Sequence, residues 1–336
     1  MTVPHLAPAA PARPWRKRAG RIGAGVLLVV VAAILVATHR DLLLAAPATL
    51  ARSCPTWVLV AVALECTSLI AYALLQRRLL RAGGAAVRLR SVLGTVVGAD
   101  AIATLVPIGG SGLAMAFAYR DFRRDGVDAP VAPMTPVLSA AISGSAFVGL
   151  VAVAAVVAQG ADVAGFALAV LVVVAVLAAV LLRGRRTAGP AALLSRASRL
   201  VGSVRVTIAA RVAAVLDGWA RRRIGTAAIG YAALCGGARW SADAMCLAAA
   251  IAATGVGVPW DRLLLVWAAG AAVTTLGLTP GGLGTADAVL VTALVGTGMA
   301  PAAAGAATVL YRLIALKPVP RIAWFAYRRR LARAAS

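Results

Sequence analysis

The chain has 336 residues, of which 62% are apolar, and a mean hydropathy of +0.91. Soluble domains are about 45–50% apolar, so this composition excludes an ordinary soluble protein and indicates a chain that crosses a membrane several times. The net charge is +23, from 34 Lys and Arg against 11 Asp and Glu.

Several apolar segments approach or exceed the roughly 20 residues that a helix needs to cross a bilayer. Six predict full spans: Ile22–Thr38, Trp57–Gln76, Val131–Ala158, Val163–Leu182, Thr226–Ala253 and Ala302–Tyr327. The first of these follows a charged stretch, as in a signal peptide, but its long apolar run and unconvincing cleavage site predict a helix that is kept. Two further segments are interrupted: Ser91–Tyr119 at "VPIGGSG" and Trp260–Gly296 at "TPGGLG".

The basic residues are concentrated in five places. Twenty-nine of the 34 lie in the N-terminus, in residues 77–90, 120–124 and 183–223, and in the tail from Lys317. Cytoplasmic loops carry such an excess, so we expect these regions and both termini in the cytoplasm, where they would also attract anionic lipid headgroups. A charge distribution that follows topology argues against a nucleic-acid partner.

The two interrupted segments predict re-entrant hairpins. Ser91–Tyr119 has cytoplasmic charge on both sides, and its arms of about 16 and 8–10 residues are short for two crossings. We therefore expect a hairpin that enters from the cytoplasm. The last span ends inside, so Trp260–Gly296 begins and ends outside and would form a second hairpin from the opposite face.

An internal repeat connects the two interruptions. Four glycines recur at an offset of 172 residues, namely Gly109, Gly110, Gly112 and Gly126 as Gly281, Gly282, Gly284 and Gly298, and Pro107 matches Pro280 within one residue. This pattern, with the opposite entry sides, predicts two inverted halves. Irregular backbone survives in a bilayer only where protein or water covers it, and paired broken segments are typical of a transporter's binding site. Close packing of helices at glycine is the alternative interpretation.

The predicted organisation has five parts. They are a basic N-terminus 1–21, a membrane half 22–182 with the hairpin 91–119, a basic linker 183–225, a membrane half 226–327 with the hairpin 260–296, and a basic tail 328–336. Apolar residues in the linker keep three- and four-residue spacing, which predicts an amphipathic helix on the cytoplasmic membrane surface. That helix could instead be a docking site for a partner enzyme.

Ionisable residues inside membrane segments are costly and often functional. Asp287 lies seven residues after Pro280, and Asp100 lies seven residues before Pro107. Either carboxylate could face a central cavity and bind a cationic headgroup or a proton. Arg312 could offer a phosphate a fixed charge, and Glu65 lies in the middle of a span. The alternative for each is a hydrogen-bonded structural role.

Arg239 and Asp243 are four residues apart, so they share a helix face and are expected to neutralise each other. Motifs for hydrolytic, metalloprotease, nucleotide-binding or dinucleotide-binding sites are absent from the sequence. With four dispersed cysteines and only His5 and His39 as histidines, we expect no metal, no cofactor and no enzymatic activity.

The second interruption, "LTPGGLGTADAVLVTALVGTGM", resembles the late P-G-G-L-G-x-x-E/D signature of the flippase-like family that includes the membrane region of lysylphosphatidylglycerol synthases. The "ATVLYRLI" that follows is also similar, through Tyr311 and Arg312. The resemblance covers roughly residues 20–325 and implies movement of lipids or lipid-linked headgroups between leaflets. We expect a stand-alone membrane region without the soluble aminoacyl-transferase domain of the synthases. Small residues around Gly109–Gly112 stand where many relatives carry Arg and Glu.

These observations predict an all-α integral membrane protein with six full spans and two opposed re-entrant hairpins, in a plasma membrane that the Ala-, Val- and Arg-rich composition suggests is bacterial. The expected function is translocation of a phospholipid or polyprenyl-linked glycolipid. The rival is a scaffold that recruits a glycosyltransferase or lipid-modifying enzyme, and an intramembrane enzyme is disfavoured. The candidate substrate-binding residues are Pro107, Gly109, Gly110, Gly112, Pro280, Gly281, Gly282, Gly284, Asp287, Arg312, Asp100 and Glu65.

Overall fold

A computed structural model describes residues 53–106, 109–159, 225–276 and 279–316. These residues form eight α-helices and one short 3-10 turn, and no strand occurs among them. The elements are α3 Pro55–Ala82, α4 Leu89–Leu105, α5 Gly110–Arg124, α6 Val131–Gln159, α10 Thr226–Ala253, α11 Leu263–Leu276, η2 Pro280–Gly282, α12 Thr285–Gly296 and α13 Pro301–Ala315. The all-helical fold that the sequence predicts is therefore found throughout the described residues.

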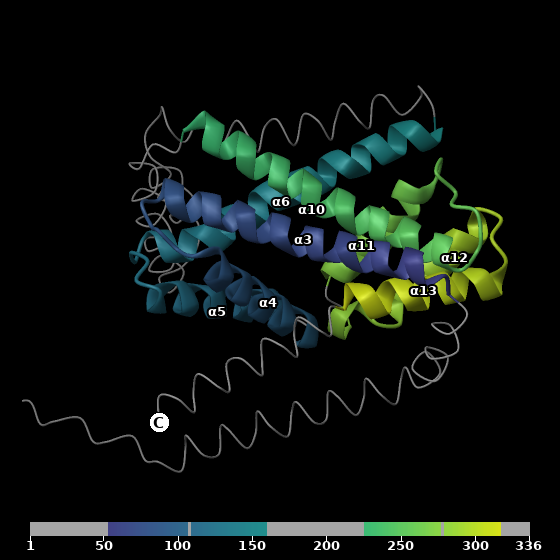
Figure 1. Ribbon diagram of the computed structural model, residues 1–336, viewed down its shortest axis with the longest axis horizontal. Coiled ribbons are helices and arrows are strands. Elements are labelled where there is room, and N and C mark those ends of the chain that lie inside the picture. The colour runs from purple at the N-terminus through teal and green to yellow at the C-terminus, as the bar shows by residue number, and fades with distance from the viewer. Residues whose placement is uncertain (1–52, 107–108, 160–224, 277–278, 317–336) are drawn as a thin grey trace, which may run out of the picture.

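Three long helices, α3, α6 and α10, pack against one another along the molecule, and the shorter helices lie at its two ends. Figure 1 shows α4 and α5 at one end of α3, and α11, α12 and α13 at the other. Each end has its own apolar core. One core is built around Leu79, Val92 and Phe122, and the other around Leu247, Trp267 and Leu310, all of them at most 1% exposed.

The helix bounds match most of the predicted segments. Thr226–Ala253 has the predicted limits, and α6 ends one residue beyond its prediction. The predicted spans Ile22–Thr38 and Val163–Leu182, the linker helix and the end of the last span lie outside the described residues. Of the described helices, α3 and the part of α6 over residues 131–155 are long and apolar enough to cross a membrane.

One arm of the first interrupted segment is longer than the sequence predicts. We expected about 8–10 residues ending at Tyr119, following the length of the apolar run, but α5 has 15 residues and continues to Arg124. Its last turns bury Asp121 and Phe122 while Arg123 and Arg124 are exposed. The apolar run therefore underestimates a helix whose charged end still packs against α4 and α6.

The offset of 172 residues extends beyond the glycines to the order of the helices. Shifting the bounds of α3 by 172 gives 227–254, against 226–253 for α10, and shifting those of α4 gives 261–277, against 263–276 for α11. The turns after α5 and α12 both contain a glycine with positive φ, Gly126 at 81° and Gly298 at 93°. Within the described residues, each half therefore contains one long helix, a pair of shorter helices joined at the interruption, and a further helix.

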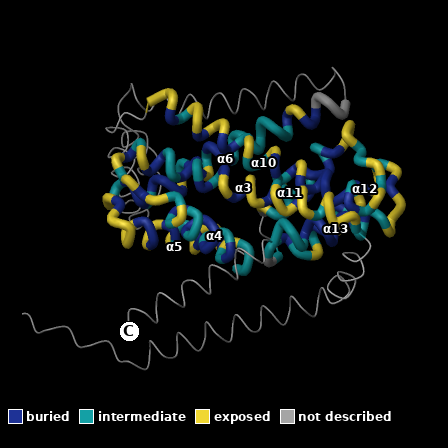
Figure 2. Tube along the Cα trace, viewed as in Figure 1, coloured by how far each residue is buried: buried dark blue, intermediate teal, exposed yellow. Residues whose placement is uncertain are grey.

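The outer faces of the long helices carry exposed apolar side chains. Leu59 and Ile70 on α3 and Leu234 on α10 are 70%, 43% and 70% exposed, and Figure 2 shows the exposed positions on the outward side of α3. Large apolar side chains that face outward are typical of helices surrounded by lipid.

Candidate functional site

A cavity of about 310 Å³ lies where the two interrupted segments meet. It is bounded by α3, α4 and the start of α5 from the first half, and by α10, α11, the second interruption and α13 from the second half. Its polar lining residues are Ser68, Asp100, Thr104, Ser111, Arg239, Asp243, Thr274, Thr275, Thr279, Tyr311 and Arg312. Residues from both interrupted segments therefore line one polar space.

The first interruption depends on two glycines that line this cavity. Gly109, the residue directly before α5, has φ of 99°, a left-handed conformation that is unfavourable for residues with a Cβ. A Cβ on Gly110 would lie 2.8 Å from the carbonyl oxygen of Ala103. The absence of side chains thus lets α5 start close against the end of α4. Pro107 lies outside the described residues.

The second interruption contains three glycines within four residues whose backbone has positive φ. Gly281, Gly282 and Gly284 have φ of 63°, 69° and 78°, and Pro280 belongs to the short turn η2. A Cβ on Gly281 would lie 2.7 Å from Cγ2 of Thr104 on α4. The end of α4, just before the first interruption, is therefore in direct contact with the second interruption.

Asp287 and Arg312 form a buried ion pair beside the second interruption. The distance from Arg312 Nε to Asp287 Oδ1 is 2.6 Å, and the side chains are 10% and 8% exposed. Asp287 Oδ2 also accepts a hydrogen bond from the Gly284 amide at 2.8 Å, and Arg312 donates to the Gly281 carbonyl. The charge of Arg312 is therefore balanced, and the pair fixes the turn to α13.

Arg239 and Asp243 do not pair with each other, contrary to the sequence-based expectation. The carboxylate of Asp243 accepts hydrogen bonds from Trp267 Nε1 at 2.9 Å and from the Tyr311 hydroxyl at 3.2 Å. The guanidinium of Arg239 instead contacts aromatic rings and Ser143. Residues four apart share a helix face, but donors and rings on neighbouring helices offer each side chain a closer partner.

The remaining candidate residues differ in their relation to the cavity. Asp100 lines it from α4. Glu65 is buried on α3, at 3% exposure, but is not among the lining residues. Gly112 is exposed, one position beyond the lining residue Ser111.

Sequence reasoning missed several hydroxyl-bearing residues of the cavity. Ser68 lies in the middle of α3, and Thr274, Thr275 and Thr279 flank the second interruption. The stretch "VTTLGLTP" places three threonines beside the break, and this local polarity was the available signal. The cavity thus combines hydroxyls, carboxylates and guanidinium groups, which suit the binding of a polar or charged group. Within the described ranges, no group of three or more His, Cys, Asp or Glu could hold a metal ion.

The comparisons with known proteins agree with a membrane location. The model of the family described as "Lysylphosphatidylglycerol synthase TM region" matches residues 22–319. No curated protein matches the chain. The match includes all the helices that form the cavity and connects the chain with lipid metabolism in a membrane. This chain therefore belongs to the lysylphosphatidylglycerol synthase transmembrane-region family.

Proposed function

We propose that this protein moves a phospholipid or a polyprenyl-linked glycolipid between membrane leaflets without acting as an enzyme. The headgroup would cross through the polar cavity while the acyl or prenyl chains stay in the surrounding lipid. The observation that carries the proposal is the cavity itself, because two interrupted segments from two similar halves meet around it.

The lengths of the helices support an interruption inside the bilayer. At 1.5 Å per residue, the 17 residues of α4 and the 12 of α12 span about 26 Å and 18 Å, less than the roughly 30 Å of a hydrocarbon core. Helices that end within a bilayer leave polar backbone groups, which must be covered by protein or water. An aqueous cavity at that depth would satisfy these groups and hydrate a headgroup in passage.

The proposed topology is that of two opposed re-entrant hairpins in inverted halves, in a plasma membrane with both termini in the cytoplasm. The basic residues in the last turns of α3 and α5, namely Arg81, Arg123 and Arg124, support a cytoplasmic location for the first hairpin. The basic residues at that face would attract lipids with anionic headgroups.

Transport can be tested by narrowing the cavity. The full chain would be reconstituted in vesicles that contain a headgroup-labelled phospholipid, and its appearance in the outer leaflet would be followed with a membrane-impermeant reductant. Ala271→Trp places a large side chain on a lining position, whereas Ala288→Trp makes the same change at an exposed position of α12. We expect transport to be lost in the first variant and kept in the second.

Equal rates for these two variants would contradict passage through the cavity. If vesicles with the wild-type protein and empty vesicles gave the same rate for phospholipid and polyprenyl-linked probes, lipid transport itself would be wrong. The scaffold hypothesis would then gain support. It could be tested by copurification of a partner enzyme that is lost when residues 190–223, which lie outside the described residues, are replaced.

A further inference from the structure

Arg239 is held in the cavity by three long helices. Its Cζ lies 4.2 Å from the ring centroid of Tyr72 on α3 and 4.4 Å from that of Trp240 on α10. One guanidinium nitrogen donates to Ser143 Oγ on α6 at 3.0 Å, and Trp240 Nε1 donates to the carbonyl of the same serine at 2.7 Å. Aromatic faces and one hydroxyl therefore fix the position of this cation.

The charge of Arg239 is not balanced by a nearby carboxylate. Within the described residues, no carboxylate oxygen lies within 4.0 Å of its guanidinium, whereas Arg312 is paired with Asp287 at 2.6 Å. A guanidinium group has five N–H donors. In Arg239, one guanidinium nitrogen donates a hydrogen bond to Ser143 Oγ. Arg239 lies halfway along α10, where an unpaired cation in a membrane segment is costly and tends to be functional.

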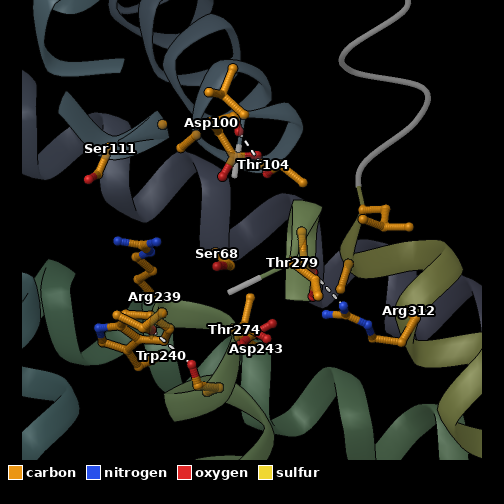
Figure 3. A pocket seen from close by; sticks show the side chains of 18 of the residues that line it. Ser68, Asp100, Thr104, Ser111, Arg239, Trp240, Asp243, Thr274, Thr279 and Arg312 are labelled. Atoms are coloured by element: carbon orange, nitrogen blue, oxygen red, sulfur yellow. Dashed lines mark hydrogen bonds between the residues drawn. The ribbon is translucent and has the colours of Figure 1, made fainter. Parts of the chain in front are cut away.

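The start of α5 faces the same cavity. Gly109, Gly110 and Ser111 line it, and no side chain caps the first amides of the helix. The first N–H groups of a helix have no intrahelical acceptor and carry a partial positive charge. Figure 3 shows Arg239 extending from α10 toward Ser111, so two kinds of anion-binding group face one space.

The acidic residues of the cavity limit the charge that it can accept. Both oxygens of Asp243 are within hydrogen-bond distance of Trp267 or Tyr311 donors, and Asp100 lines the cavity from α4. A group with two negative charges would be repelled by these carboxylates more strongly than a group with one. A phosphodiester carries a single negative charge and can accept two parallel hydrogen bonds from arginine.

We propose that Arg239 and the N-terminus of α5 bind the phosphodiester of the lipid headgroup, while Arg312 has a structural role. This assignment rests on the proposed function for how the lipid reaches the cavity. Tyr72 is a positioning residue, because its ring packs against the guanidinium of Arg239 and limits how the N–H donors can be oriented. The sequence suggested Arg312 as the residue that binds a phosphate, whereas this inference assigns that role to Arg239.

The test measures binding rather than transport. The purified full chain in a neutral detergent would be titrated with dioctanoyl phosphatidylmethanol, whose headgroup is a bare phosphodiester, and the change in tryptophan fluorescence would give Kd. Loss of a hydrogen-bonded charged donor weakens binding roughly 10- to 100-fold. We expect that loss for Arg239→Gln and a smaller one for Arg239→Lys, which keeps the charge without the planar fork. Arg262→Gln removes an exposed charge outside the cavity as the control and should not change Kd.

Further variants separate recognition from folding. Tyr72→Leu should weaken binding several-fold, whereas Tyr72→Phe, which keeps the aromatic face, should bind as the wild type does. The neutral dioctanoylglycerol should bind equally to the wild type and to Arg239→Gln. Titration with dimethyl phosphate tests whether the bound phosphodiester belongs to a lipid or to a soluble molecule. If dimethyl phosphate bound as tightly as dioctanoyl phosphatidylmethanol, the ligand would be a soluble phosphodiester and the assignment to a lipid headgroup would be overturned.

An unchanged Kd in Arg239→Gln, or equal losses in Tyr72→Phe and Tyr72→Leu, would overturn the inference. Its failure is distinguishable from failure of the proposed function. Phosphodiester binding that depends on Arg239 in a protein without lipid transport would keep this site and refute transport. Lipid transport with an unchanged Kd in Arg239→Gln would do the reverse.

Discussion

The buried ion pair between Arg312 and Asp287 offers a strong test of how the second interruption is held together. Arg312→Met would leave the Asp287 carboxylate, 8% exposed, without its cation. Because so little of either side chain reaches solvent, screening is weak, and removing one partner of such a pair costs about 3–5 kcal/mol. Asp287→Asn should have a similar cost, since the guanidinium would then be uncompensated.

The double variant Arg312→Met/Asp287→Asn should recover most of this loss. Replacing both partners of a buried pair is often close to neutral, and the remaining cost is the hydrogen bond that Arg312 donates to the Gly281 carbonyl, about 1 kcal/mol. Two independent losses would sum to about 6–10 kcal/mol, so the predicted coupling is several kcal/mol.

The assay is unfolding of the purified chain in mixed micelles by titration with SDS, followed by circular dichroism. The exposed pair of Arg262 and Asp261, whose closest atoms are 3.5 Å apart, provides the matched control, and Arg262→Met should cost less than about 1 kcal/mol. If the two changes at Arg312 and Asp287 were additive, or if Arg312→Met cost no more than the control, the proposed structural role of the pair would be refuted.

Two further predictions concern contacts beside the cavity. Gly281→Ala should destabilise the fold by about 2–4 kcal/mol, because positive φ strains alanine by about 1–2 kcal/mol and the new Cβ would lie 2.7 Å from Thr104 Cγ2. Thermal unfolding should show partial rescue by Thr104→Ser and a smaller effect for Gly298→Ala, which has no atom within 4 Å of its Cβ, and no rescue would contradict the clash. Tyr311→Phe should cost about 1–3 kcal/mol, because it removes one donor to Asp243. In the same assay, an equal loss when the change is made in an Asp243→Ala background, which lacks both acceptor oxygens, would show that this hydrogen bond is not the cause.

The helical segments and the breaks could be predicted from the sequence because both depend on local properties. The limits Thr226–Ala253 follow from an apolar run that begins after a block of arginines. The positive φ of Gly109 and Gly281 follows from glycine within an apolar segment, where few other residues tolerate that conformation. Residues of both interrupted segments line one cavity, and the inverted arrangement of the two halves stays a prediction.

The contacts of single charged residues could not be predicted in the same way. Spacing on one helix predicted that Arg239 would pair with Asp243, but Tyr72 and Ser143 lie on other helices and are distant in sequence. Hydropathy likewise placed the end of α5 at Tyr119, because it detects the limit of the apolar run and not the limit of the helix. Both errors arise where tertiary packing overrides a local rule.

The most direct test of the central claim is whether water reaches the interruptions. Single cysteines would replace Ser111 and Thr275, which line the cavity and are exposed, in a chain without its four native cysteines. Ile70→Cys, on the outward side of α3, is the control that faces lipid. A polar cavity predicts that a membrane-impermeant thiol reagent modifies both positions much faster than the control. Modification of neither position would show that the interruptions are dry packing contacts and would contradict passage of a headgroup between them.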